Sequence, residues 1–139
     1  MILVVDASVA AKWYFDEEHA AAARWLRESR ASLVAPALLL AEIGSISWKK
    51  RARGEITVGE AEGVVAAMRR ADLVWYTIDQ LAEGALRVAC WLRHSYSDCL
   101  YLALAEAVGG RVVTADRRLH AVVTGTPLAG RCCWIEELQ

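Results

Sequence analysis

Two short apolar runs of this sequence end at an aspartate. Residues 2–5 read ILVV and are followed by Asp6, and residues 111–114 read RVVT and are followed, after one alanine, by Asp116. Runs of this composition and length are typical of buried strands. Ligands bind beyond the carboxyl ends of the strands in an open parallel sheet, so both acids lie where chemistry is expected. Each could instead cap a turn or a helix, as strand-end aspartates often do.

Glu42 is a third acid with an unusual position. In the stretch PALLLAEIGSISWKK it lies four residues from both Leu38 and Ile46, which predicts the centre of the apolar face of a helix. A buried, unpaired carboxylate costs several kcal/mol, so it needs a cation, hydrogen-bond donors or access to water. A salt bridge to a core arginine is the alternative. Lys49 and Lys50, seven and eight residues away, are poorly placed to provide one.

Asp98 is the fourth acid. It stands in the first turn of a helix that is apolar nearly all round, in the stretch SYSDCLYLALAEA. Backbone N–H groups and the helix dipole favour an anion there by about 0.3–1 kcal/mol, which alone could account for this residue. In combination with the other three acids it indicates more, because all four could converge at one edge of the sheet.

Converging carboxylates need a positive partner. Two of them about 4 Å apart repel by roughly 4 kcal/mol at an effective dielectric constant of 20, and a divalent cation removes this penalty. Ligation by carboxylates without His or Cys favours Mg²⁺ or Mn²⁺ over zinc. Such a site can orient a phosphodiester and activate a water molecule. The chemistry that fits is metal-assisted phosphodiester hydrolysis, with a catalytic and metal-binding set formed by Asp6, Glu42, Asp98 and Asp116.

The elements that must position these acids alternate along the chain. Strands are predicted at residues 2–5, 33–35, 73–78, 111–114 and 132–135, and helices at residues 8–15, 18–30, 37–53, 58–71, 81–94 and 98–108. This alternation is typical of an α/β fold with a central parallel sheet of about five strands. Thr57 and Ser97 are predicted to cap the fourth and sixth helices. Without a linker or repeat, residues 1–139 are expected to form a single domain.

Composition limits the classes of protein that remain. Hydrophobic residues make up 56% of the chain, yet the longest uncharged apolar stretch, residues 33–41, is far shorter than the roughly 20 residues that cross a bilayer. The start of the chain lacks the pattern of a signal peptide, so a cytoplasmic protein without a membrane anchor is expected. The formal net charge of −1 implies that nucleic acid could be bound only by local patches. Four cysteines without CxxC spacing are expected to be reduced and mostly buried.

Basic and aromatic residues suggest contact surfaces. Arg117 and Arg118 directly follow Asp116 and are predicted to bind substrate phosphates. The KKRARG cluster at residues 49–54 is explained equally well by phosphate contacts or by a solvated helix end. The run WYF at residues 13–15 cannot point into one core from a helix, so a partner surface is expected there. The other five tryptophans are expected to pack internally, and the three histidines are assigned no catalytic task.

Four motifs together carry a family resemblance. The stretches VVDASVAAKW, PALLLAEI, YSDCLYLALA and VVTADRRL resemble, in this order and spacing, the PIN domain and more closely the VapC-like ribonuclease toxins of prokaryotic toxin–antitoxin pairs. The resemblance implies a three-layer α/β/α sandwich and a homodimer. It implies Mg²⁺- or Mn²⁺-dependent endoribonuclease activity on structured RNA such as tRNA or rRNA. It also implies an antitoxin partner, whose C-terminal segment occupies a groove on the toxin.

The resemblance also assigns supporting roles and leaves alternatives open. It implies that Ser8 and Thr114 position the acids without being metal ligands themselves. The chain departs from many family members at Ser45, where they carry Asn. A housekeeping PIN nuclease in RNA maturation or DNA processing would use the same chemistry. A catalytically silent PIN fold that binds other proteins is the alternative from a different class. The compact chain favours the toxin, and the presence of all four acids argues against a silent fold.

Overall fold

The computed structural model describes residues 1–138, and in this part of the chain five parallel strands form one sheet. Their order is β3-β2-β1-β4-β5. The strands are β1 (Ile2–Val5), β2 (Ser32–Pro36), β3 (Val74–Tyr76), β4 (Arg111–Thr114) and β5 (Cys132–Trp134). Each falls within or beside one of the five predicted runs, so the predicted parallel sheet is confirmed.

Strand β1 is the centre of the sheet. Leu3 pairs with Leu33 of β2 on one side and with Arg111 of β4 on the other. The chain runs outward from β1 through β2 to β3, and the second half of the sheet, β4 and β5, is built on the opposite side. The strand order therefore reverses between β1 and β4, and such switch points are where open α/β sheets bind ligands. Asp6 and Asp116 follow the two strands at this point.

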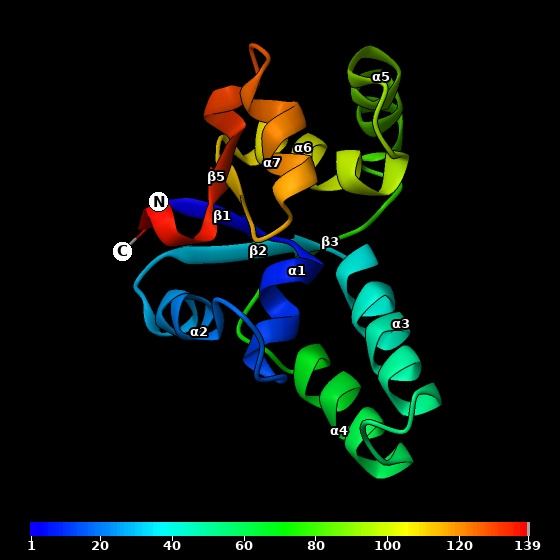
Figure 1. Cartoon of the computed structure of the whole chain (residues 1–139). Helices are drawn as coiled ribbons and strands as arrows, with labels where there is room; N and C mark the ends of the chain where they lie inside the picture. Colours follow the sequence, from blue (N-terminus) through cyan, green and yellow to red (C-terminus); the bar gives the residue numbers. More distant parts are fainter. Residues whose placement is uncertain (139) are drawn as a thin grey trace.

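Helices cover both faces of the sheet, which confirms the predicted three-layer α/β/α sandwich (Figure 1). One face carries α1 (Ala7–Ala10), α2 (Ala20–Glu28), α3 (Leu38–Ala52) and α4 (Val58–Arg69). The other face carries α5 (Ala82–Leu92), α6 (Tyr96–Val108) and α7 (Arg117–Thr124). Short 3₁₀ turns lie at Ala11–Trp13, Ala129–Arg131 and Ile135–Leu138. Helices α3 and α4 form a hairpin that extends away from the sheet (Figure 1).

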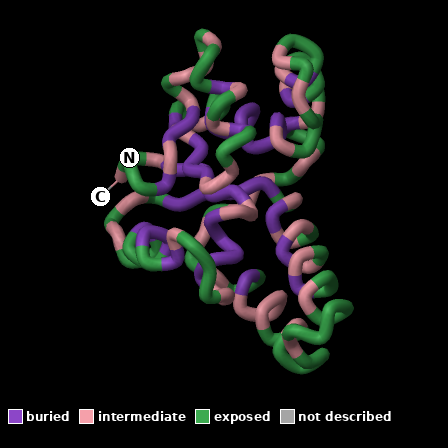
Figure 2. The backbone as a smooth tube through the Cα atoms, viewed as in Figure 1, coloured by how far each residue is buried: buried purple, intermediate pink, exposed green. Residues whose placement is uncertain are grey.

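Helix α6 lies at the core of the molecule. Every residue from 99 to 105 is buried, and the helix packs against β1, β2 and β4 on one side and α5 on the other. Figure 2 shows the buried segments gathered along the sheet and the helices that cover it. Such complete burial explains the nearly uniform apolar character of this helix in the sequence. Its first turn, which carries Asp98, is thereby fixed at the carboxyl edge of the sheet.

Some predicted helix boundaries are wrong. Helix α6 begins at Tyr96, and Ser95 rather than Ser97 caps it, because the Ser95 hydroxyl accepts a hydrogen bond from the backbone N–H of Asp98 at 3.4 Å. Helix α7 was not predicted at all. Thr57 does cap α4, where it forms a reciprocal capping box with Glu60.

The sequence had suggested that the aromatic run at residues 13–15 forms an exposed partner surface. In the structure this run is buried or half-buried instead. Trp13 is buried and donates a hydrogen bond from its indole Nε1 to the carbonyl of Ala23 at 2.8 Å, while Tyr14 and Phe15 are half-buried against the core. The reason is that α1 gives way to a tighter 3₁₀ turn, over which α2 folds back. The exposed tryptophans lie elsewhere and had been expected to pack internally: Trp25, Trp48 and Trp91.

The cysteines are free and mostly buried, as the sequence predicts. Cys90 is exposed, the other three cysteines are buried, and all four are free thiols. Among residues 1–138, no helix has both the length and the apolar character needed to cross a membrane.

Candidate active site

Asp6 is a buried acid at the carboxyl end of β1. It caps α1, as the alternative reading of the sequence allowed, and its Oδ1 accepts hydrogen bonds from the Ser8 hydroxyl at 2.6 Å and from the backbone N–H of Val9 at 3.2 Å. Only 5% of the residue is exposed. Burial raises its pKa from 3.8 to about 6, although these hydrogen bonds act in the opposite direction. Both of these bonds end on Oδ1, and the Thr114 side chain is a further donor that lowers the pKa of this carboxyl.

Glu42 lies on α3 and is held by a phenol. The hydroxyl of Tyr101, on α6, donates a hydrogen bond to its Oε1. Burial raises the pKa of Glu42, and the charge of Asp98 raises it further. Leu39 and Ile43 belong to the fully buried stripe of α3. Glu42 flanks this stripe, so the prediction that it lies at the centre of the apolar face is wrong.

Asp98 has a histidine partner that sequence reasoning missed. The Nε2 atom of His94 lies 2.6 Å from Asp98 Oδ2, and the His94 side chain is 8% exposed. His94 belongs to the short connection that follows α5, and its spacing of four residues from Asp98 is the only local clue to the contact. Tyr101 was missed as well, because its partner Glu42 is 59 residues away in the chain.

A network of hydroxyls joins the ends of β1 and β4. The Ser8 hydroxyl, which donates to Asp6, accepts a hydrogen bond from the backbone N–H of Ala115 at 2.9 Å. It also lies 3.3 Å from the Thr114 hydroxyl oxygen, which accepts a bond from the backbone N–H of Asp116 at 3.0 Å. The supporting role of Ser8 and Thr114 at the site stays a prediction.

Asp116 and the two arginines after it lie at the start of α7. The Asp116 carboxylate accepts hydrogen bonds from the backbone N–H groups of Arg118 and Leu119, so it caps this helix. The guanidinium of Arg117 stacks over the ring of Trp134, with its carbon 4.8 Å from the ring centroid. Arg118 is exposed. The role of both arginines in substrate binding stays a prediction.

Three of the four acids influence one another directly. The charge of Asp98 raises the pKa of both Asp6 and Glu42, and all three acids raise the pKa of Tyr101. Within residues 1–138, no lysine or arginine lies within 4.0 Å of any of the four predicted acids, so the alternative of a salt bridge to a core arginine does not apply to Glu42. The site therefore gathers negative charge without a contacting lysine or arginine, and the basic side chain that touches Asp98 is His94.

The donor chemistry of this edge fits a hard divalent cation. All the acid ligands are oxygens, and Asp6 is an anion that is buried at a cost. In the described part of the chain, however, no three His, Cys, Asp or Glu side chains lie close enough together to hold a metal ion. Glu42, Asp98 and Asp116 are instead in contact with Tyr101, His94 and the start of α7. The metal-binding role of the four acids stays a prediction.

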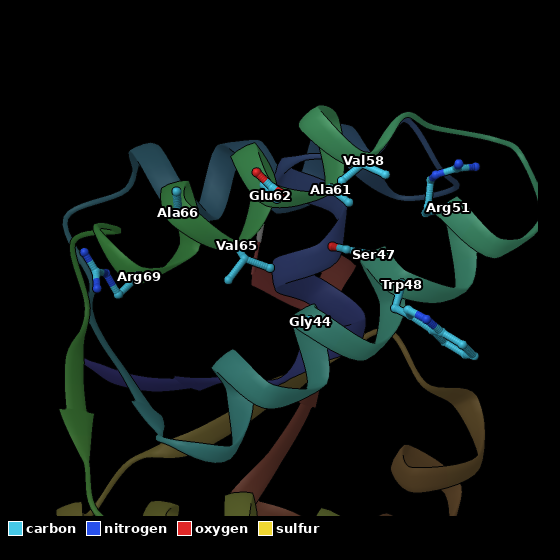
Figure 3. Close-up of a pocket in the computed structure, with 10 residues that line it drawn as sticks. All are labelled: Gly44, Ser47, Trp48, Arg51, Val58, Ala61, Glu62, Val65, Ala66 and Arg69. Carbon is cyan, nitrogen blue, oxygen red and sulfur yellow. The ribbon is translucent and has the colours of Figure 1, made fainter.

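A separate apolar groove lies between α3 and α4 (Figure 3). It is lined by Gly44 and Ser47 of α3 and by mostly small or apolar side chains of α4, with Glu62 among them, and it contains none of the four predicted site acids. Trp48, which is 68% exposed, stands beside it. Figure 3 shows Arg51 and Arg69 at opposite ends of the groove. This surface combines exposed apolar area with positive charge at its ends.

Sequence comparison identifies the family of this chain. The PIN domain family matches residues 3–124, which is most of the chain, and the chain belongs to this family. Its curated relatives include two ribonucleases named VapC3. That of Pyrobaculum aerophilum is 31% identical over 123 residues, which cover 86% of this chain and 92% of the relative. That of Mycobacterium tuberculosis is 29% identical over 117 residues and covers 84% of each chain.

Solved structures agree with this assignment. PAE2754 from Pyrobaculum aerophilum has a TM-score of 0.69 at 25% identity, with 99% of this chain and 86% of that chain covered. VapC20 of Mycobacterium tuberculosis, described as a toxin that cleaves the sarcin-ricin loop, has a TM-score of 0.66 at 18% identity and covers 86% and 93%. VapBC2 of Rickettsia felis, bound to a DNA fragment from its promoter, has a TM-score of 0.65 at 11% identity and covers 96% and 98%. The last two similarities concern the fold alone.

Proposed function

We propose that this protein is a divalent-metal-dependent endoribonuclease and the toxin of a toxin–antitoxin pair. The observation that carries the proposal is the group of Asp6, Glu42 and Asp98 at the carboxyl edge of the sheet, buried or half-buried and without a contacting lysine or arginine. The ribonuclease names of its relatives support the reaction. The neighbours described as a toxin and as a VapBC complex support the biological role.

The proposed cofactor is Mg²⁺ or Mn²⁺, held by Asp6, Glu42 and Asp98 with Asp116 beside them. When bound, such an ion polarises the phosphoryl group, lowers the pKa of the attacking water and stabilises the leaving oxygen. The chain supplies the orientation of its own ligands. Two donors on Oδ1 fix the carboxylate of Asp6, and one oxygen of Glu42 remains free beside the one bonded to Tyr101.

The proposed substrate is structured RNA, such as tRNA or rRNA, which is contacted locally. The net charge of −1 gives no general attraction for a polyanion, so phosphate contacts must come from side chains near the site. Arg118 is exposed two residues after Asp116 and is suited to this role. Arg117 follows Asp116 directly and is already stacked on Trp134, which holds its charge in a fixed place.

The proposed partner is an antitoxin, and the groove between α3 and α4 is the surface that fits it. A segment with apolar side chains would cover Val58 and Trp48, and acidic side chains would pair with Arg51 and Arg69 at the ends. We also propose a cytoplasmic homodimer, as the family resemblance implies. A short reading frame next to the gene, encoding a protein that inhibits the nuclease, separates this role from that of a housekeeping PIN nuclease.

The reaction is tested by incubating the purified protein with total RNA, with and without Mg²⁺ or Mn²⁺, and mapping new 5′ ends. We expect cleavage at defined sites that requires the metal. Asp98→Asn should reduce the rate by at least about 100-fold, because even partners behind a metal ligand contribute about 10- to 100-fold. Asp16→Asn, at an acid whose side chain is 94% exposed, is the matched control. Cutting that needs no metal, or that survives Asp98→Asn, contradicts the proposal.

A further inference from the structure

Tyr101 connects the two helical layers at the carboxyl edge of the sheet. It lies on α6, three residues after Asp98, and it is 1% exposed. Its hydroxyl donates to Glu42 Oε1 on α3, which covers the opposite face of the sheet (Figure 1). Phenylalanine would fill the same core position, so packing alone does not require the hydroxyl at this position.

The chemistry of this donor suits a site that must remain negative. A phenol ordinarily ionises only at about pH 10, so it is a neutral donor over the whole physiological range. A lysine or arginine at this place would hold Glu42 but would also cancel its charge. A neutral hydroxyl orients the carboxylate and leaves its charge to a ligand.

We propose that Tyr101 is a positioning residue, whose hydroxyl holds Glu42 in the orientation in which that carboxylate joins Asp6 and Asp98 in binding a divalent cation. The inference rests on the proposed function, since it needs these acids to be the ligands. Glu42 accepts the bond with Oε1, so its second oxygen is free for the cation. In this respect Tyr101 resembles the partners that orient the ligands of other metal sites.

The chain provides a matched control for the hydroxyl. Tyr14 is half-buried against the core, and its hydroxyl has no hydrogen-bond partner within residues 1–138. Tyr14→Phe and Tyr101→Phe therefore remove the same atom from two packed tyrosines. Only the second variant removes a contact with one of the proposed ligands.

The test uses Mn²⁺ alone as the probe. Calorimetric titration and the rise in melting temperature with Mn²⁺ measure binding to the wild type and to both variants without any substrate. We expect Tyr101→Phe to bind Mn²⁺ about 10- to 100-fold more weakly and Tyr14→Phe to match the wild type. RNA cleavage by Tyr101→Phe should fall in kcat at low Mn²⁺ and recover at high Mn²⁺, with KM for RNA unchanged. A defect in folding would appear as a lower melting temperature already in the absence of Mn²⁺, which is measured for all three proteins.

A double-mutant cycle with Glu42→Gln gives an independent measurement. If Tyr101 acts through Glu42, then Tyr101→Phe should weaken Mn²⁺ binding no further once Glu42 is replaced. Unchanged Mn²⁺ binding by Tyr101→Phe, or additive effects in the cycle, overturns the inference while the proposed function stands. A wild-type protein that neither binds Mn²⁺ nor cleaves RNA overturns the proposed function, and the inference with it.

Discussion

Replacing Asp6 by Asn should change the dependence of stability on pH in a defined way. Folding raises the pKa of Asp6 from 3.8 to about 6, so the folded protein disfavours the ionised carboxylate by roughly 3 kcal/mol. The folded state binds this proton more tightly than the unfolded state. The stability contributed by the protonated form is therefore complete below pH 3.8 and is lost as the pH rises through 6. Asparagine does not ionise, and its side-chain oxygen can still accept from Ser8.

The magnitude is measured as a difference between two proteins at two pH values. Urea unfolding of the wild type and of Asp6→Asn, both in EDTA, gives the free energy of unfolding at about pH 4.5 and about pH 7.5. Between these values the wild type should lose about 2 kcal/mol relative to the variant, the part of the roughly 3 kcal/mol that is titrated in this window. Any constant cost of the new amide cancels in this comparison, and so do the other titrating groups.

Asp16→Asn is the control, since it makes the same chemical change at an exposed acid. It should keep the same free-energy difference from the wild type at both pH values. The reasoning is refuted if Asp6→Asn also keeps a constant difference, because Asp6 would then ionise in the folded protein as easily as in the unfolded chain.

Two further substitutions test the frame around the site. Gly110→Ala should lower the free energy of unfolding by about 1–3 kcal/mol, because a Cβ there would lie 2.5 Å from the carbonyl oxygen of Ile2. Gly130→Ala is the control, since Gly130 has open space around it, and it should change the free energy of unfolding by less than about 0.5 kcal/mol. Ser8→Ala should lower the free energy of unfolding, measured in urea, by about 1–3 kcal/mol, because the backbone N–H of Ala115 after β4 loses its acceptor. Ser45→Ala, at an exposed position, is the control.

The sheet was predictable because its information is local. Each strand is a short run of β-favouring residues, and the alternation with helices requires a parallel sheet. Helix α7 was missed for a related reason, since eight residues give little periodic signal and its cap, Asp116, had been interpreted as a site acid. The two interpretations proved compatible, because Asp6 and Asp116 both cap helices while they stand at the switch point.

The acids were predictable from the sequence, but their partners were not. Asp98 and Glu42 stand out because a charged residue breaks an apolar pattern. Tyr101 and His94 break no pattern, and their roles depend on what tertiary packing brings near. The exposure of Trp48 was hidden in the same way, since it depends on how α4 folds against α3.

The capping role of Asp116 has an evolutionary consequence. Asparagine caps a helix about as well as aspartate does, so the two N–H groups now bonded to this carboxylate would keep an acceptor after a change to Asn. Such a chain would keep α7 and its shape while giving up one negative charge. Under the proposed function, a descendant that lost this acid would persist as a stable but inactive protein that differs from a working copy by a single side chain.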